Sequence, residues 1–324
     1  MKLQDVHKED FEREIFRLKK IDLDALIARG PFMVNVCPAC KSKDAVHKFD
    51  KDGFHYLECD VCQTLFVSPV PTDEAKEWYL ENSGYLRYWR EQMPAEVRAS
   101  RNKAVYSKRA QSLAAIADKY QVSFKRILEI GGGMGEMSVF IDQELTYDEY
   151  LIVEPQPITS QYPKVKIINS TIENLMLNEQ VDLVLAYELI EHITDPDILL
   201  NIILSNLVPG GFFILSTPGS GGFDIKVLEE KARAIGYDHV SLYNVNSLKL
   251  LLERHGFEIV EISTPGTLDV QMVKQAYDKK EIRYDNIALN FLMESNEEYR
   301  DALQEYLKNN LLSSHLMCIA RKSS

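Results

Sequence analysis

The pattern of apolar and polar residues changes near residue 121. Before this point, apolar residues recur at near-helical spacing in residues 4–29 and 74–120, with a break around 82–84, which predicts helices. Beyond it, short runs of branched apolar residues alternate with helical or turn-bearing segments. These runs are RILEI, YLIVE, KVKII, VDLVLA, FFILST, FEIVEIS and HLMCIAR. Such alternation predicts an α/β domain with a mainly parallel sheet and helices on both faces.

This pattern divides the chain into four parts. We predict amino-terminal helices over residues 1–30, a cysteine-bearing block over 31–72, connecting helices over 73–120 and the α/β domain over 121–324. Residues 265–312 separate the last two strand-like runs and have helical periodicity after Leu268. They predict a helical insertion before the last strand.

Four cysteines stand in two pairs, CPAC and CDVC, with 18 residues between the pairs. Each pair can place two thiolates on one knuckle turn, and two knuckles complete a tetrahedral zinc site without an open position. The chain between them predicts two strands around a turn at Asp52 and Gly53. We therefore predict a zinc ribbon with a structural Zn²⁺, against the alternatives of two disulfides or a redox pair. The predicted ligands are Cys37, Cys40, Cys59 and Cys62.

The stretch RILEIGGGMGEMSVF, residues 126–140, predicts a strand, a glycine turn and the start of a helix. The dinucleotide fingerprint G-x-G-x-x-G would place its third glycine where this chain has Glu136, which argues against a nicotinamide cofactor. Glu154 ends the next strand, roughly 20 residues later, where a carboxylate can bind both hydroxyls of an adenosine ribose. Nicotinamide and adenosyl cofactors share this last feature.

The spacing E-x-G-x-G-x-G, followed by a strand that ends in an acidic residue, resembles class I S-adenosylmethionine-dependent methyltransferases. The resemblance implies a Rossmann-like, seven-stranded, mostly parallel sheet and S-adenosylmethionine as cofactor. It also implies cofactor contacts at the glycine loop, at the ends of the next two strands and after the fourth. These residues are Glu129, Gly131, Gly133, Gly135, Glu154, Thr171 and Tyr187.

Further segments extend the resemblance. VDLVLAYELIEHITDP, residues 181–196, is similar to the fourth strand and following helix of these enzymes, where E-H-x-x-D-P recurs. DHVSLYNVNSLKLLLERHGFEIVE resembles a segment of bacterial sugar and small-molecule methyltransferases, and the ribbon's place before the domain is similar to that in nucleotide-sugar C-methyltransferases. The resemblance implies a small-molecule acceptor, such as a sugar, a nucleotide sugar or a related biosynthetic intermediate.

Three residues are candidates for catalysis, and all belong to the segments just described. His192 is a candidate general base, since histidine titrates near neutrality, and Glu188 directly follows the fourth strand. His239 is the second candidate base. The alternatives are a helix residue packed near the cofactor for His192, and for His239 a loop residue that caps the helix beginning near Asn246.

Composition bears on partners and location. The chain has 37 Lys and Arg residues against 49 Asp and Glu, a formal charge of -12, which makes a nucleic-acid partner unfavourable. The basic cluster of residues 98–109 is interpreted as a solvated helix face. No apolar run approaches the ~20 residues of a membrane span, and the amino terminus lacks a secretory signal, so we expect a cytoplasmic protein without membrane contact. The insertion could form a lid or a homodimer contact.

Two other functions compete with small-molecule methylation. The first is methylation of RNA or protein with the ribbon as a docking module. The segment AYELIEH lacks an N-P-P-Y-like tetrapeptide, which argues against this function. The second is a cofactor-binding protein without turnover.

Overall fold

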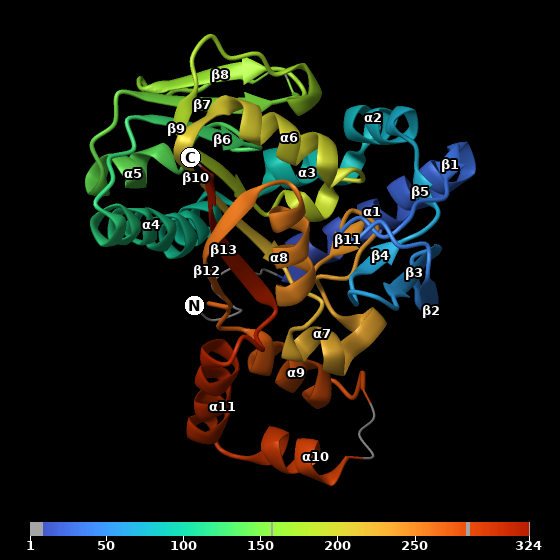
Figure 1. Ribbon diagram of the computed structural model, residues 1–324. Helices are drawn as coiled ribbons and strands as arrows, with labels where there is room; N and C mark the ends of the chain where they lie inside the picture. The colour runs from blue at the N-terminus through green and yellow to red at the C-terminus, as the bar shows by residue number, and fades with distance from the viewer. Residues whose placement is uncertain (1–8, 157, 283–285, 324) are drawn as a thin grey trace.

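A seven-stranded sheet forms the centre of the protein (Figure 1). The computed structural model describes residues 9–156, 158–282 and 286–323, so the first residues of the predicted amino-terminal helices lie outside it. The strand order is β12-β13-β10-β9-β6-β7-β8. The strands are β6 (Arg126–Ile130), β7 (Glu149–Glu154), β8 (Val165–Asn169), β9 (Val181–Tyr187), β10 (Leu207–Pro218), β12 (Phe257–Ser263) and β13 (His315–Lys322). Within this sheet β13 alone runs antiparallel to its neighbours, which confirms the predicted fold class.

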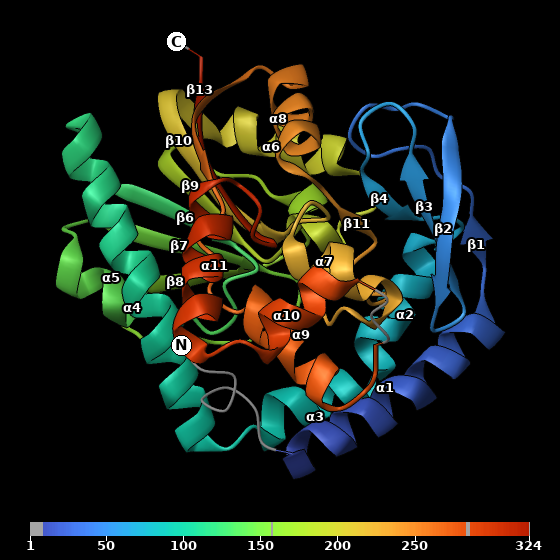
Figure 2. The same cartoon turned by 90° about the horizontal axis from the view of Figure 1, so that it is seen from below.

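Helices cover both faces of the sheet (Figures 1 and 2). Successive residues of a strand point to opposite faces, so Ile127 of β6 packs with α4 (Ala95–Tyr120) and α5 (Ser138–Glu144). Leu128 faces the other layer, which contains α6 (Pro196–Asn206) and α8 (Val245–Arg254). Burial on both faces explains why the strands read as continuous apolar runs.

The amino-terminal helices lie beside the cysteine-bearing block. α1 (Glu9–Arg29), α2 (Asp73–Asn82) and α3 (Gly84–Gln92) are separate helices. Ser83 makes the expected break, because its hydroxyl caps α3 by accepting from Leu86 N at 3.0 Å.

The cysteine-bearing block forms its own small sheet, which a distant segment completes. β2 (Ala45–Lys51) and β3 (Phe54–Cys59) pair around the turn at Asp52 and Gly53, as the sequence predicts. β4 (Leu65–Val67) pairs with β3 and, on its other edge, with β11 (Ser241–Leu242). Two further short strands, β1 (Phe32–Met33) and β5 (Val70–Pro71), pair separately. The block is therefore joined to the α/β domain by strand pairing.

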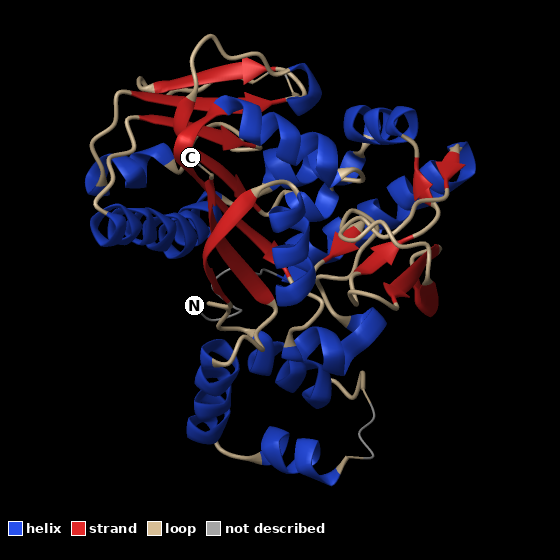
Figure 3. Ribbon diagram, viewed as in Figure 1, coloured by secondary structure: helices blue, strands red, loops and turns tan. Residues whose placement is uncertain are grey.

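The predicted insertion is helical, with α9 (Asp269–Asp278), α10 (Ile287–Glu294) and α11 (Glu297–Asn309), which lie below the sheet in Figure 1. Figure 3 shows in blue that this region is built from helices. Its apolar residues share one core with α7 (Phe223–Leu228), the ribbon strands and α1. Within the described residues, no helix has the length and apolar character that a membrane span needs.

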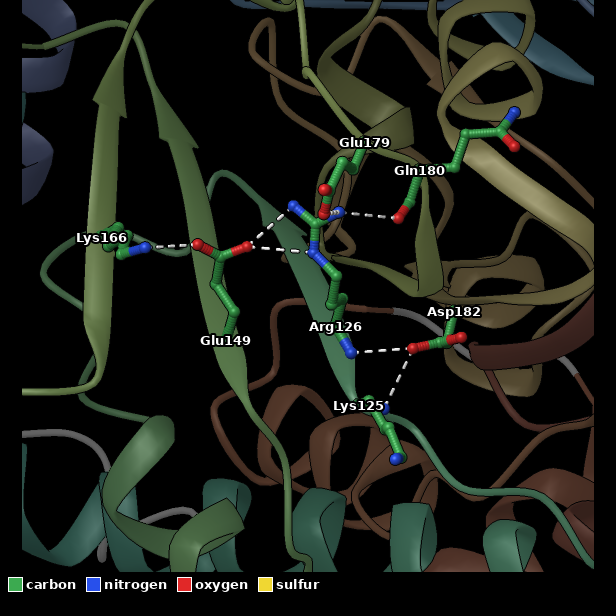
Figure 4. Close-up of polar contacts among 7 residues, drawn as sticks. All are labelled: Lys125, Arg126, Glu149, Lys166, Glu179, Gln180 and Asp182. Atoms are coloured by element: carbon green, nitrogen blue, oxygen red, sulfur yellow. Dashed lines mark hydrogen bonds and ion pairs between the residues drawn. The ribbon is translucent and has the colours of Figure 1, made fainter.

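An ionic network joins four strands, β6, β7, β8 and β9, at their amino ends (Figure 4). The Arg126 guanidinium binds Glu149 at 2.8 Å and Glu179 at 2.7 Å, and the Asp182 carboxylate accepts from the backbone N–H of Arg126 at 2.8 Å. These contacts align β6, β7 and β9 at the end of the sheet away from the glycine loop. The opposite, carboxyl end is where open parallel sheets bind ligands.

Candidate active site

The glycine loop is a tight turn at the carboxyl end of β6. Gly131, Gly133 and Gly135 have φ values of +73°, +55° and +82°, a region that other residues enter at a cost. A Cβ on Gly135 would lie 3.0 Å from the side chains of Ile152 and Val165. The glycines thus let the loop pass close over β7 and β8 and leave its backbone exposed to a ligand.

Glu129 lies directly beneath this loop. It is buried, accepts a hydrogen bond of 2.6 Å from the Tyr150 hydroxyl, and would be 2.5 Å from a Cβ on Gly132. Burial raises its pKa, although the bond from Tyr150 and the charge of Arg109 act in the opposite direction. A cationic ligand group near the loop would favour the ionised form of Glu129.

The other predicted donor-side residues follow along the same edge of the sheet. Glu154 is the last residue of β7, and its carbonyl accepts from Ser170 N at 3.1 Å just after β8. Thr171 precedes the short 3₁₀ helix Ile172–Asn174 and accepts at 3.1 Å from the Asn174 side chain. The glycine loop, Glu154 and Thr171 therefore stand at the carboxyl ends of three adjacent parallel strands.

Tyr187 closes the fourth strand, β9, rather than following it. Its ring is buried, and the Arg109 guanidinium lies over it, 4.2 Å from the ring centroid. The interpretation of Arg109 as part of a solvated helix face is therefore wrong: its side chain is 17% exposed and reaches the end of the sheet. Helical spacing alone could not show this, because the direction in which α4 faces depends on its packing.

Glu188 is held in a strained backbone conformation directly after β9. Its φ is +52°, and its Oε1 accepts from the Ser216 hydroxyl at 2.6 Å. Arg109 Nη2 and His315 Nδ1 lie 3.7 and 3.6 Å from the same oxygen. Burial opposes ionisation, but His315, Ser216 and Arg109 together hold the pKa of Glu188 below its usual value.

His315, the first residue of β13, was missed by the sequence analysis. It belongs to the site because β13 runs antiparallel to β10, which brings the start of β13 to the carboxyl end of the other strands. The one sequence signal was the run HLMCIARK, which is similar to the antiparallel closing strand of class I methyltransferases; the first residue of such a strand lies at this edge.

His192 and His239 lie 47 positions apart in the sequence and meet in the fold. His192 ends the 3₁₀ helix Ile190–His192, so the prediction that it begins the helix after β9 is wrong; α6 starts at Pro196. The two rings are edge to face with centroids 4.8 Å apart. His192 Nδ1 is 2.6 Å from the carbonyl oxygen of Asp238, and His239 Nδ1 is 2.7 Å from that of Ala234.

These contacts determine the chemistry of both imidazoles. A carbonyl oxygen only accepts, so each Nδ1 donates and each neutral ring keeps a bare Nε2. The alternative that His239 caps a helix is wrong, since Asn244 caps α8 by accepting from Ser247 N at 2.9 Å. Burial lowers the pKa of His239, and the charge of Asp238 and the bond to the Ala234 carbonyl only partly oppose this shift.

Glu191 is the third member of this cluster and is fully buried. One carboxylate oxygen accepts from the Thr217 hydroxyl at 2.9 Å, and among the described residues the other, Oε1, has no hydrogen-bond partner. Burial and the neighbouring Glu188 raise the pKa of Glu191 well above its usual value.

The four cysteines form one cluster, with all sulfurs within 4.8 Å of one another. Cys37 Sγ lies 3.5 Å from Cys62 Sγ, and Cys40 Sγ 3.5 Å from Cys59 Sγ. A disulfide needs about 2.05 Å, whereas sulfurs of a tetrahedral zinc site, each about 2.3 Å from the metal, lie about 3.8 Å apart. The arrangement fits the metal and not two disulfides.

The two knuckles have the same backbone form. Lys41 N and Gln63 N each donate at 2.9 Å to the carbonyl of the first cysteine of the pair, and both residues have positive φ values, +60° and +58°. The cysteine cluster is also tied to the candidate active site. Asn244 Nδ2 donates to the carbonyl of Cys62 at 2.8 Å, and Lys41 pairs with Asp195 at 3.2 Å, three residues after His192.

A seven-stranded sheet with one reversed strand, and a glycine loop after the strand that comes first in the sequence, is typical of the class I methyltransferase fold. Residues 89–262, which are 174 of 324 residues, match the family described as a methyltransferase domain, and the chain belongs to this family. The matched region is therefore a methyltransferase domain.

Similar proteins carry related descriptions. A protein of Mycolicibacterium smegmatis named "Probable S-adenosylmethionine-dependent methyltransferase" is 30% identical over 116 residues, which are 36% of this chain and 42% of that relative, so less than half of the relative is matched. Among solved structures, the Haemonchus contortus phosphoethanolamine N-methyltransferase 2 is 19% identical, with a TM-score of 0.42 and 62% and 49% of the two chains covered. The plantazolicin methyltransferase BamL is 15% identical, with a TM-score of 0.44 and coverages of 74% and 95%.

Proposed function

We propose that this enzyme methylates a small molecule, of the class of sugars, nucleotide sugars or related biosynthetic intermediates. The observation that carries the proposal is the pairing of β4 with β11. This pairing fixes the ribbon against the segment that contains His239, which lies two residues before β11. Val67 N also donates to the carbonyl of Val240, the residue after His239, at 2.9 Å. A module that docks RNA or protein would need a free surface, and this edge of the ribbon is used internally. The acidic net charge of -12 acts in the same direction.

The donor is proposed to lie along the carboxyl ends of β6, β7, β8 and β9. In this proposal the backbone of the glycine loop contacts the methionine part and Glu129 serves its ammonium group, directly or through water. Glu154 accepts from the ribose hydroxyls. Thr171 borders the adenine, and Tyr187 lines the floor beneath the sulfonium.

Methyl transfer itself needs the acceptor atom in line with the methyl carbon and sulfur. The acceptor forms a bond to the methyl carbon, the C–S bond breaks, and its electron pair returns to sulfur as S-adenosylhomocysteine. If the acceptor is a hydroxyl or an acidic carbon, its proton must also leave. The bare Nε2 of His192 or His239 can take it, and Glu188 supplies a nearby negative charge.

The cysteine cluster is proposed to hold a structural Zn²⁺. Four thiolates leave no open position on the metal, so its role is to order the ribbon and, through β11 and Lys41, the loops that carry His239 and His192.

Labelling tests the substrate class. The zinc-loaded protein is incubated with methyl-labelled S-adenosylmethionine and a cell extract, and products are separated by size. We expect label in the small-molecule fraction, and none with a His192→Ala/His239→Ala variant that still binds S-adenosylhomocysteine. Label in RNA or protein alone would replace the proposal with the docking function. Tight donor binding without transfer from any extract would favour a protein without turnover.

A pH-rate profile then tests the proton acceptor. If one imidazole takes the proton, the wild type has an acidic limb that vanishes in the variant of that histidine alone, because the neutral base is lost at low pH. Wild-type turnover at saturating acceptor in both single alanine variants would reject histidine as the base.

A further inference from the structure

We propose that Glu191, His192 and His239 form a second metal site, separate from the cysteine cluster, which takes a divalent transition metal. The metal would bind an oxygen of the acceptor next to its reacting atom. The binding of the acceptor by the metal rests on the proposed function, whereas the metal site itself does not.

The distances between the three side chains suit one ion. One ligand atom of each residue lies within 4.8 Å of the others. Ligands about 2.1 Å from a shared metal are separated by roughly 3 to 4 Å, so a small movement of the side chains would complete the site. The three residues come from two segments that strand pairing and the ribbon hold together.

The two imidazoles are already in the tautomer that a metal requires. Each Nδ1–H donates to a backbone carbonyl, that of Asp238 for His192 and that of Ala234 for His239. Metal-binding histidines commonly donate their second nitrogen in this manner, which fixes the ring and leaves Nε2 for the metal.

Glu191 provides an independent indication of a cation. Its side chain is fully buried, one oxygen is satisfied by Thr217, and Oε1 has no partner among the described residues. An ionised carboxylate in such a place is costly unless it is paired or binds a metal. The ammonium group of Lys19 pairs with the Asp238 carboxylate, 3.1 Å away. It is therefore not the cation that neutralises Glu191.

The ligand set also indicates the kind of metal. Two imidazoles and one carboxylate suit Mn²⁺, Fe²⁺, Co²⁺ or Zn²⁺ and leave coordination positions open, whereas Mg²⁺ and Ca²⁺ prefer oxygen ligands throughout. An open position next to the end of β9 can hold an acceptor oxygen. A bound hydroxyl loses its proton more readily, and that proton passes to solvent. With the metal present both Nε2 atoms are ligands, so neither imidazole takes the proton directly.

Metal binding can be measured without the reaction. Protein loaded with a single equivalent of Zn²⁺, which the four thiolates of the cysteine cluster take up, is titrated with Mn²⁺ and followed by electron paramagnetic resonance and calorimetry. We expect one equivalent to bind, with affinity at least tenfold weaker in His239→Ala and in the conservative Glu191→Gln. Circular dichroism establishes that each variant is folded. His192→Asn is a second imidazole variant, should His239→Ala fail to fold.

The matched control is His47→Ala/His55→Ala. These two exposed ribbon histidines share Asp50, at 2.7 and 2.6 Å, and form the other histidine–carboxylate group within reach of one ion. The control should bind Mn²⁺ like the wild type. No binding to wild type, or binding lost in the control and kept in Glu191→Gln, would overturn the proposal. Labelled small-molecule product that forms unchanged in the presence of a chelator, with no Mn²⁺ bound, would overturn this inference and leave the proposed function intact.

Discussion

The proposed donor side and the proposed acceptor side of the candidate active site are built in different ways. Apart from Tyr187 at the end of β9, the residues of the donor side lie in one continuous stretch of chain, from Glu129 to Thr171, that crosses three adjacent strands. The acceptor side joins Arg109, Glu191, His239 and His315, which come from four separate segments. The ribbon braces this second side through β11 and Lys41. A local stretch can hold a cofactor by itself, whereas the acceptor side depends on tertiary packing.

Replacing two of the four proposed zinc ligands should separate the two sides most strongly. Cys37→Ser/Cys59→Ser leaves two thiolates, and structural zinc contributes on the order of 10 kcal/mol to folding of small zinc modules. We expect the ribbon and β11 to lose order, with turnover falling at least about 100-fold. Zinc content, turnover and S-adenosylhomocysteine binding are measured together.

Cys318→Ala is the control for the cysteine variants. Cys318 is buried in β13 outside the cluster, so its loss should lower stability by about 1 to 2 kcal/mol but keep the zinc. Full turnover in the double serine variant would contradict the bracing role of the ribbon.

A buried carboxyl pair outside both sides, Asp224 of α7 and Asp269 of α9, gives the stability of the protein a pH dependence. Burial, followed by the neighbouring Asp269, raises the pKa of Asp224 to about 7. The unfolded chain releases this proton near pH 4, so the stabilisation is complete below that pH and is lost as pH rises through 7. Asp224→Asn, which stays neutral, should therefore gain stability over wild type between pH 5 and pH 8. The gain is on the order of 3 kcal/mol, since one pKa unit corresponds to about 1.4 kcal/mol.

Denaturant unfolding at both pH values measures this difference. Asp269→Asn serves as a comparison and not as a control. Asp269 accepts hydrogen bonds from the Ser313 hydroxyl and from the backbone N–H of Ser314, both at 2.6 Å, so its replacement should destabilise the fold at either pH. A gap between Asp224→Asn and wild type that stays constant with pH would contradict the assignment.

Arg109 links α4 to the acceptor side, and its loss should have a moderate effect. Arg109→Met keeps the length of the side chain but removes the charge over Tyr187 and beside Glu188. We expect a stability loss of about 1 to 2 kcal/mol. The pKa of Glu188 should rise, since Arg109 helps to lower it, so any acidic limb due to Glu188 moves to higher pH.

Thermal unfolding and a pH-rate profile measure these two effects. Lys108→Met, at the exposed neighbouring position, removes the same charge and should change neither. Equal effects of the two substitutions would place Arg109 among ordinary helix-surface residues.

Lys41 tests the weakest link between ribbon and acceptor side. Its ammonium pairs with Asp195 and Asp197 at 3.2 and 2.9 Å, and the side chain is 35% exposed. We expect Lys41→Met to lower stability by less than about 1 kcal/mol and turnover by about twofold. The exposed Lys43→Met is the control, and both are compared by steady-state kinetics. A large loss of S-adenosylhomocysteine affinity in Lys41→Met would contradict the assignment of Lys41 to the acceptor side.

The same contrast explains what the sequence could predict. Apolar runs and glycine spacing are local properties, so they indicated the sheet and the turn after β6. The cysteine cluster was equally clear, since its two pairs stand at the spacing of metal ligands. Arg109 and His315 were missed because their roles depend on which way α4 faces and where β13 starts.

His192 and His239 were found as separate candidates, and their contact could not be predicted. The link between them is the pairing of β4 with β11, two short strands separated by more than 170 residues. No periodicity marks a strand of two residues such as Ser241–Leu242. The tautomers likewise depend on the carbonyls of Asp238 and Ala234, which only the folded loop brings near.

Titration calorimetry with S-adenosylhomocysteine tests the division into two sides most directly. Gly133→Ala and Gly210→Ala are compared, because both glycines have positive φ, +55° and +75°, and an added Cβ meets no atom within 4 Å at either. The conformational strain that alanine introduces at these positive φ values should therefore be similar at both positions. Only Gly133 lies in the glycine loop. The account predicts at least tenfold weaker binding in Gly133→Ala, with affinity close to wild type in Gly210→Ala and His239→Ala. Unchanged binding in Gly133→Ala together with lost binding in His239→Ala would contradict it.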